Sequence, residues 1–266
     1  MTTKPPFTLL LAGLALCVVA ISCRPGATGQ AAAQDAPQGR SVQGPSVPAP
    51  GDPVFSDDFS ADELDTDRWV HTVKNDLAED IVDIQEGRLR LAASTLKTDD
   101  TTVKYHGVRT KTQVVDLSDG PLTITLDLDW NNQPNGCYLS ADLYLCPEEV
   151  DSPTDAEQYL CCQYIGVPPG QNARFVLSRK RGGYDEPLYT EGWPEKREGR
   201  KIGLQHLRLI VDRTSIVVVE NDAERCEHHD LGLEFEKAYL YIQQSSHSNY
   251  PLRTVFFDNI TVQPPR

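Results

Sequence analysis

Positively charged residues are scarce in this 266-residue sequence, which has 25 Lys and Arg against 39 Asp and Glu and a formal charge of -14. It also lacks any block rich in Lys and Arg. Proteins that bind nucleic acid or an anionic bilayer present clustered basic side chains to the phosphates. The sequence therefore predicts no nucleic-acid partner and no electrostatic attraction to a membrane surface.

Long apolar runs are also scarce, and the one clear exception covers residues 7–21. This run follows Lys4 and ends just before a small residue and a cysteine. It is too short and too weakly flanked for a stable transmembrane helix. Its position and length are typical of an export signal.

The end of this signal, Ala20-Ile21-Ser22-Cys23, is similar to a bacterial lipobox, although Ala20 stands where leucine is usual. In a lipobox the chain is cut before the cysteine, which carries the lipid. We expect residues 1–23 to be a lipoprotein signal peptide and Cys23 to be lipidated, so that the exported protein is held in the cell envelope by its lipid alone. The alternative is a secreted or periplasmic protein in which Cys23 has no such role.

Residues 24–53 contain six Pro and five Gly and show no apolar periodicity. Such a segment cannot bury an apolar face, and its composition is typical of a disordered, flexible tether. We therefore expect the folded domain to span residues 54–266.

Amphipathic helical patterns are nearly absent from this domain, where alternation with a period of two dominates. Residues 122–129 and 137–145 alternate between apolar and polar side chains, as strands with one buried face do. Further strands are expected at residues 87–92, 107–113, 158–165, 173–179, 205–211, 215–220, 238–244 and 254–262. Only residues 60–69 and 231–237 are candidates for a helical turn. Many short strands without intervening helices predict an all-β fold, an antiparallel β-sandwich.

Four short motifs lie near the two ends of the domain. They are VFSDDF at residues 54–59, DRW at 67–69, QEGRLRL at 85–91 and VFFDNITV at 255–262. Together they resemble the concanavalin A-like lectin/glucanase (laminin G-like) jelly-roll family. The resemblance implies two curved sheets, first and last strands that pair, and a concave face that commonly holds a saccharide. Because lectins, glycosidases and laminin G-like modules share this fold, it implies architecture more specifically than function.

The resemblance also implies a structural calcium ion, which many family members hold where the two chain ends meet. Carried over to this sequence, its ligands would be Asp258, with Asp58 and the carbonyl of Gly87 as companions. These are oxygen donors of the kind that Ca²⁺ prefers. The alternative is that Asp258 only caps or pairs with a neighbouring strand.

Catalytic motifs of this fold are missing. The family 16 glycoside hydrolases use E-x-D-x-x-E or E-x-D-x-E on one strand, and neither pattern occurs here. The nearest substitute is the set of Asp127, Asp129 and Asp142, which regular alternation places on the same side as Tyr138 and Tyr144. These aspartates would line a saccharide groove as hydrogen-bond acceptors or as a displaced acid/base pair. The alternative is a solvated polar face on a very acidic domain.

Aromatic and amide side chains add to this predicted groove. Four tyrosines occupy strand positions whose side chains are expected to point away from the core: Tyr138, Tyr144, Tyr239 and Tyr241. Sugar rings stack on flat aromatic faces of this kind. Gln243 and Asp142 would bind sugar hydroxyls, and His247 lies in a polar connection, residues 244–251, expected at the rim of the sandwich. The alternative is that the tyrosines pack as ordinary strand residues.

Five cysteines lie beyond the tether, an odd number, so at least one stays unpaired in an oxidising compartment. Cys146 ends one expected strand and the adjacent Cys161 and Cys162 lie in the next. A disulfide from Cys146 to one of these two is expected if the strands are neighbours. Cys137 has core parity and is expected to be a buried thiol.

These observations predict a lectin-like module that binds carbohydrate and holds no cofactor other than a structural calcium ion. Two alternatives remain. One is a glycan hydrolase or polysaccharide lyase with a non-standard set such as Asp129, Asp142 and His247. The other is a structural or protein-binding module of the envelope.

Overall fold

The computed structural model describes residues 52–96, 98, 102–129, 138–166, 174–190, 203–247 and 251–264. Within these ranges the chain forms antiparallel strands and one short 3-10 helix, η1 (Pro153–Asp155). No helix in this part of the chain has the length and apolar character needed to span a membrane. Of the two stretches expected to hold a helical turn, residues 60–69 contain one, since the amides of Arg68 and Trp69 both donate to the carbonyl of Asp65. Residues 231–237 form no such turn, and that expectation was wrong.

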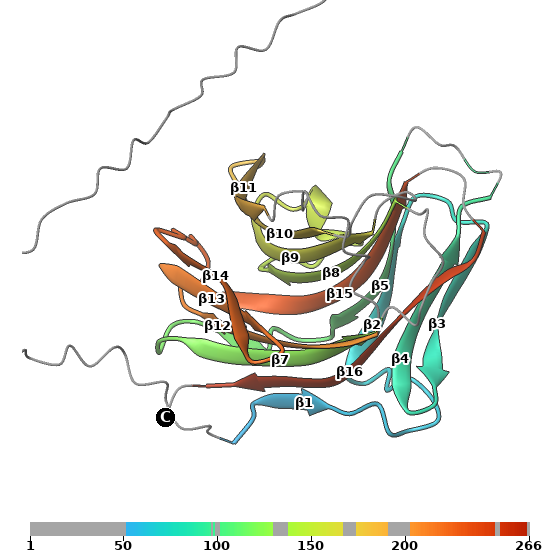
Figure 1. Cartoon of the computed structure of the whole chain (residues 1–266), viewed down its shortest axis with the longest axis horizontal. Helices are drawn as coiled ribbons and strands as arrows, with labels where there is room; N and C mark the ends of the chain where they lie inside the picture. The colour runs from blue at the N-terminus through green and yellow to red at the C-terminus, as the bar shows by residue number, and fades with distance from the viewer. Residues whose placement is uncertain are drawn as a thin grey trace, which may run out of the picture. The chain divides into compact units, whose positions relative to one another are not determined.

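The strands form two sheets, each with eight strands among the described residues. Sheet A has the order β14 (Ala223–His229), β13 (Ser215–Glu220), β12 (Leu204–Val211), β7 (Leu122–Asp129), β16 (Arg253–Gln263), β4 (Arg88–Ser94) and β3 (Glu79–Gln85), with β1 (Phe55–Asp57) also paired to β16. Sheet B has the order β11 (Tyr184–Thr190), β10 (Arg174–Arg181), β9 (Tyr159–Gly166), β8 (Tyr138–Cys146), β15 (Lys237–His247), β5 (Lys104–Thr110) and β2 (Trp69–Lys74), with β6 (Val115–Asp116) also paired to β15. Figure 1 shows sheet B bending from β10, β9 and β8 round to β5 and β2.

The core lies between the two sheets, because each central strand turns its apolar residues to the other sheet. On β7 of sheet A these are Leu122, Ile124, Leu126 and Leu128, and on β8 and β15 of sheet B they are Leu143, Leu145, Leu240 and Ile242. Each such side chain contributes about 1.5–3 kcal/mol when it is fully buried. The alternation in the sequence therefore identified the buried side of these strands correctly.

The first and last strands pair, as the terminal motifs predicted. Phe55 lies opposite Val262 in the β1–β16 ladder. Trp69, which begins β2, packs edge-on against Phe55 with ring centroids 5.3 Å apart. Its indole Nε1 donates a hydrogen bond of 2.8 Å to Asp57 Oδ2. The fourth motif also joins them, because Leu89 on β4 lies opposite Phe257 on β16, so all four motif segments are neighbours in the fold.

The four described cysteines are unbonded and buried, so the expected disulfide from Cys146 is wrong for this structure. Adjacent residues of a strand point to opposite faces. Cys162 accordingly lies in the core between the sheets, whereas Cys161 lies on the outer face of sheet B with Cys146. Cys161 is paired in the ladder with Tyr144, two residues before Cys146. Cys137 lies outside the described residues.

Candidate functional site

The outer face of sheet B, which points away from sheet A, carries four of the eight residues predicted to bind carbohydrate. Asp142 and Tyr144 point outward from β8, and Gln243 and Tyr241 lie directly opposite them on β15. On the other side of β8, strand β9 places Gln163 opposite Asp142. The alternation therefore grouped these four predicted residues correctly on one face.

Asp127 and Asp129 lie elsewhere, which corrects the expectation that the three aspartates converge. Both are on β7, at the centre of sheet A, and point outward from the opposite side of the sandwich. Parity within a strand identifies the buried side of that strand, but not the sheet to which the strand belongs. Asp129 and Asp142 face away from each other, so the suggested catalytic set of Asp129, Asp142 and His247 cannot assemble.

A segment of the chain lies across the outer face of sheet B. Residues 147–158, which connect β8 to β9 and are called the covering segment below, turn back over the strands. The hydroxyl of Tyr241 donates to the carbonyl of Glu148 at 2.8 Å and accepts from the amide of Val150 at 2.9 Å. Gln243 Nε2 donates to the carbonyl of Asp151 at 3.0 Å, and Gln243 Oε1 accepts from Ser152 Oγ at 3.2 Å.

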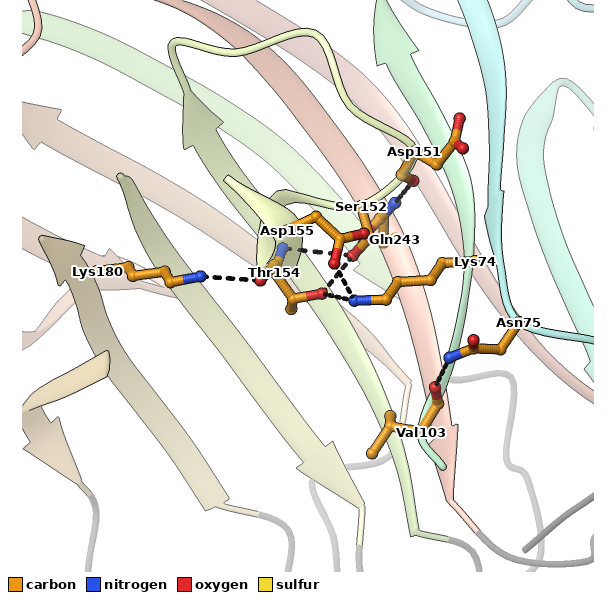
Figure 2. Close-up of polar contacts among 9 residues, drawn as sticks. All are labelled: Lys74, Asn75, Val103, Asp151, Ser152, Thr154, Asp155, Lys180 and Gln243. Carbon is orange, nitrogen blue, oxygen red and sulfur yellow. Dashed lines mark hydrogen bonds and ion pairs between the residues drawn. The ribbon is translucent and has the colours of Figure 1, made fainter. Parts of the chain in front are cut away.

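Two lysines from opposite parts of the sheet hold the middle of the covering segment (Figure 2). Lys74, on the edge strand β2, donates to Thr154 Oγ1 at 2.8 Å and to Asp155 Oδ1 at 2.6 Å. Lys180, on β10, donates to the carbonyl of Thr154 at 2.9 Å. Four strands separate β2 from β10 in the sheet. Because both lysines reach one residue, the outer face of sheet B must be concave.

The covering segment buries the tyrosines that were expected to stack on sugar rings. Tyr144 is 2% exposed and Tyr241 is 0% exposed. They pack in a small apolar cluster with Cys146, Ala156, Tyr159 and Cys161. The expectation that these two rings are presented to a ligand is wrong, because they pack against the chain itself.

Asp142 lies beside the covered region and is fully buried. Tyr144 donates to its Oδ2 at 3.4 Å, and the side chains of Ser140, Ser245 and Gln163 also surround the carboxyl. Burial raises the pKa of Asp142 to about 7, although hydrogen bonds from these four neighbours act in the opposite direction. Its second oxygen, Oδ1, has no hydrogen-bond partner among the described residues. A buried acceptor without a partner costs about 1–3 kcal/mol, so the position of this carboxyl is unfavourable for stability.

The strands around Asp142 provide no second carboxylate. Its direct neighbours on β15 and β9 are Gln243 and Gln163. The described strand side chains in the two adjacent rows, which contain Tyr144 and Ser140, include no Asp or Glu. Glycoside hydrolysis by the usual routes needs two carboxyl groups, either about 5 Å or about 6.5–9.5 Å apart. The strand side chains in these three rows therefore do not provide the second carboxyl group that such chemistry requires.

The proposed calcium ligands lie where the chain ends meet. Burial is the main cause that raises the pKa of Asp258, and the nearby carboxyls of Asp127 and Asp58 add to it. Gly87 has a left-handed φ of +68°, and a Cβ at this position would lie 4.0 Å from the carbonyl oxygen of Phe59. The donors are all oxygen, which suits Ca²⁺. Among the described residues, however, no group of three or more His, Cys, Asp or Glu is arranged to hold a metal ion.

Several residues around Asp142 were not predicted. Ser140 and Ser245 lie opposite each other on β8 and β15 and their hydroxyls are hydrogen-bonded, and Gln163 Nε2 donates to Ser140 Oγ at 3.3 Å. Their parity was available in the sequence, but the pairing of β8 with both β9 and β15 was not.

The remaining predicted residues have side chains outside the described part of the chain. The backbones of Tyr138 and His247 pair at the far ends of β8 and β15, their side chains lie outside the described part, and so does Cys23.

No protein-family model matches the sequence, and no curated protein matches it significantly in sequence. Solved structures do match the fold. The catalytic domain of an endo-1,3-β-glucanase (laminarinase) from Thermotoga petrophila is 15% identical, covers 83% of this chain and 100% of its own, and has a TM-score of 0.58. A LamA protein from Zobellia galactanivorans, in complex with laminaritriose and laminaritetraose, is 11% identical, with coverages of 81% and 100% and a TM-score of 0.57. A Bacillus subtilis protein of unknown function with a galectin-like fold is 12% identical, with coverages of 81% and 97% and a TM-score of 0.55.

At these identities the similarity shows the fold and not the activity. The chain has an all-β, concanavalin A-like jelly-roll fold, which its terminal motifs predicted. Glucanases and galectin-like proteins share this fold.

Proposed function

We propose that this protein is a lectin-like module that binds carbohydrate on the concave outer face of sheet B, at the polar cluster of Asp142, Ser140, Ser245 and Gln163. The observation that carries the proposal is the set of uncharged hydrogen-bonding side chains around Asp142 on this concave face, of which Gln163 is partly exposed. Saccharides present many hydroxyl donors, and protein sites orient them through a few placed polar groups. The surrounding hydroxyls and amide would position the carboxyl and accept or donate the remaining hydrogen bonds.

Binding without hydrolysis is favoured by the single carboxylate of this cluster. Asp142 alone could act as an acid or a base, but the usual inverting and retaining mechanisms use two carboxyl groups. A hydrolase of the usual kind would therefore need a second carboxyl group from outside the three rows around Asp142. The neighbours that bind laminari-oligosaccharides suggest β-1,3-glucan as the first probe.

The test is a binding assay with laminarin, galactan and mucin glycans on wild type, Asp142→Asn and the matched control Asp127→Asn. Asp127 is an outward-facing strand aspartate on the other sheet, bonded to His206 and Asn259. Asp142→Asn disturbs the hydrogen bonds that position Ser140, Ser245 and Gln163, each of which contributes about 0.5–1.5 kcal/mol, so it should weaken binding roughly 10-fold. Asp127→Asn should bind like wild type.

A reducing-sugar assay on the same mixtures separates binding from catalysis. Release of new reducing ends or unsaturated products by the wild type would favour the enzyme alternative. Absence of binding to every glycan, with both variants folded, would favour a structural or protein-binding role.

We further propose that a structural Ca²⁺ binds near Asp258, with Asp58 and backbone oxygens such as that of Gly87. The all-oxygen donor set and the raised pKa of Asp258 support this, because a cation would offset the repulsion among these carboxyls. Calcium at 100 times its Kd should stabilise the fold by about 2.7 kcal/mol. Thermal unfolding with Ca²⁺ and with chelator measures this difference, and an unchanged midpoint would refute the proposal.

For location, we propose export and attachment to the envelope through lipid on Cys23, supported by the sequence pattern alone. Mass spectrometry of the mature N-terminus would test it. An unmodified N-terminus would favour the secreted or periplasmic alternative.

A further inference from the structure

We propose that His71, Asp80 and His106 form a pH-sensitive clasp between the edges of the two sheets. It holds β2 to β3 while the two histidines are protonated and releases β2 as they lose their protons. These three residues are called the edge clasp below. The edge clasp shares no residue with the polar cluster around Asp142, and its action does not depend on carbohydrate binding.

The edge clasp joins strands that belong to different sheets. Asp80 lies on β3, at one edge of sheet A, whereas His71 lies on β2, at one edge of sheet B, and His106 lies on the adjacent strand β5. Oδ2 of Asp80 is 3.1 Å from Nε2 of His71, and its Oδ1 is 2.8 Å from Nδ1 of His106. Backbone pairing joins β2 to β5 and β3 to β4. The two sheet edges are therefore connected here through one shared carboxylate.

A second contact of His106 fixes the charge of its ring. Nε2 of His106 lies 2.5 Å from Oε1 of Gln244 on β15. The orientation of this amide is set by its own Nε2, which donates to the carbonyl of Arg253 at 3.1 Å. The amide oxygen and the ionised carboxylate of Asp80 can only accept hydrogen bonds. Both ring nitrogens of His106 therefore donate, so the ring carries two protons and a positive charge.

The ring of His106 is 1% exposed, and a buried cation is stable only when it is paired, as it is here by Asp80. The neighbouring strands also carry His71 on β2, Lys104 on β5 and Arg253 on β16, whereas β15 contributes the uncharged Gln244 and β4 places Ala93 opposite Asp80. Lys104 and Arg253 donate to backbone carbonyls, those of Thr102 and Leu252. The two histidines are therefore the members of this group whose charge changes near neutral pH.

The edge clasp is complete in mildly acidic solution. The hydrogen bond to Asp80 is the main cause that raises the pKa of His71 above its ordinary value of 6.5. Such a histidine contributes its full stability below pH 6.5 and loses it as the pH rises through the raised value. Burial alone would raise the pKa of Asp80, but hydrogen bonds from His106 and His71 hold it well below its ordinary value of 3.8. The contribution of the carboxylate is therefore lost only in strong acid, and the clasp opens on the alkaline side.

β2 is the strand that the edge clasp controls. It is the last strand of sheet B and pairs with β5 among the described strands. Lys74, which follows His71 on β2, donates to Thr154 and Asp155 of the covering segment. Loss of the clasp should therefore increase the local opening of β2 and loosen the covering segment at this end, while the central strands stay closed.

Nitrogen-15 NMR of the imidazole rings tests the charge assigned to His106. In the wild type at pH 7 both nitrogens of this ring should carry protons. The signals that disappear in His106→Asn identify the ring. One unprotonated nitrogen in the His106 ring at pH 7 would overturn the proposal.

Hydrogen exchange at pH 6 and pH 9, corrected for the intrinsic exchange rate, tests the release of β2. In the wild type the protection of β2 amides relative to those of the central strand β8 should fall roughly 10-fold between these values, because one unit of pKa is a tenfold change in an equilibrium constant. The protection of residues 147–158 should fall with it. A ratio that does not change with pH would overturn the proposal.

Asp80→Asn removes the charge of the shared carboxyl, so β2 should be weakly protected at both pH values. The matched control is His206→Asn, which breaks another His–Asp pair on the outer face of sheet A, where the histidine side chain is 63% exposed. This control should behave like the wild type. If Asp80→Asn does not fold, His71→Gln, which alters a 45% exposed side chain, should reduce the pH dependence. A folded Asp80→Asn or His71→Gln variant with the wild-type pH dependence would contradict the proposal.

Discussion

Sheet A and sheet B each turn one face away from the core, and among the described residues the central strands carry Asp127 and Asp129 on the outer face of sheet A and Asp142 on that of sheet B. On sheet A these side chains are paired and touch solvent. Asp127 Oδ1 lies 2.6 Å from His206 Nδ1, and Asp129 Oδ2 accepts from Arg88 at 2.7 Å. On sheet B, Asp142 is fully buried, its neighbours on the sheet are uncharged, and one of its oxygens has no partner among the described residues. The covering segment crosses sheet B, and the carboxyl beside it is desolvated.

This contrast shows that pointing away from the core is not the same as facing water. On sheet A the aspartates contact polar partners at a partly exposed surface, whereas burial on sheet B disfavours the charged form of Asp142. A buried carboxyl with a raised pKa is more often found at a functional site than on a plain surface. The same residue type therefore has a structural role on one face and a proposed binding role on the other.

Among the variants that test this contrast, Asp142→Asn is expected to change the free energy of unfolding most. The pKa of Asp142 rises from an ordinary value of 3.8 to about 7 on folding. Ionisation therefore favours the unfolded chain, and the contribution of this group to stability falls as the pH rises from about 4 to 7. This rise in pKa corresponds to a loss of about 4 kcal/mol in the free energy of unfolding at pH 8. Asp142→Asn should restore that stability, because the asparagine does not ionise. Denaturant unfolding at pH 4 and pH 8 measures it.

Asp142→Asn should therefore gain stability at high pH while it loses glycan binding. This combination distinguishes a binding residue from a structural one, since a structural role predicts that both fall together. If the stabilities of the wild type and the variant depend on pH in the same way, the proposal that Asp142 is desolvated in the folded protein is wrong.

The next effect concerns the attachment of the covering segment. Tyr241→Phe removes the hydroxyl that accepts from Val150 and donates to Glu148. Buried groups left without partners should cost about 1–3 kcal/mol in the free energy of unfolding. The control is Tyr239→Phe, whose hydroxyl only approaches Glu149 at 3.5 Å. Equal losses in the two variants would mean that the segment is not held by Tyr241.

The smallest effect is expected on sheet A. Asp129→Asn weakens the ion pair with Arg88, in which both side chains are partly exposed. Pairs of this kind contribute about 0–1 kcal/mol, and salt screens them further. Unfolding at low and at high salt should show a small loss that decreases with added salt. A loss as large as that of a buried group would erase the distinction between the two outer faces.

Central strands were predicted from the sequence better than edge strands. β7, β8, β12 and β15 alternate clearly because one side of each faces the core and the other does not. The pattern missed β3 and β14, which lie at the two edges of sheet A and show mostly intermediate or exposed side chains. An edge strand buries little of either face, so its sequence lacks a strong period of two.

The candidate site was predicted in part for a similar reason. Alternation placed Asp142, Tyr144, Tyr241 and Gln243 on one face, because parity is a local property of each strand. It could not place Asp127 on the other sheet, since the partner of a strand is set by contacts far apart in the chain. Nor could it show that residues 147–158 fold back over the two tyrosines. That arrangement depends on Lys74 and Lys180, which are more than a hundred residues apart.

The amino-acid sequence by itself determined the all-β architecture, the pairing of the two terminal strands and the side of each central strand that is buried, because these follow from local periodicity and short motifs. Only the tertiary structure decided which aspartates share a face, which tyrosines are covered and where a carboxyl is left desolvated. Those properties arise when the curvature of sheet B brings β2 and β10 within reach of one turn, and no local pattern in the chain encodes that approach.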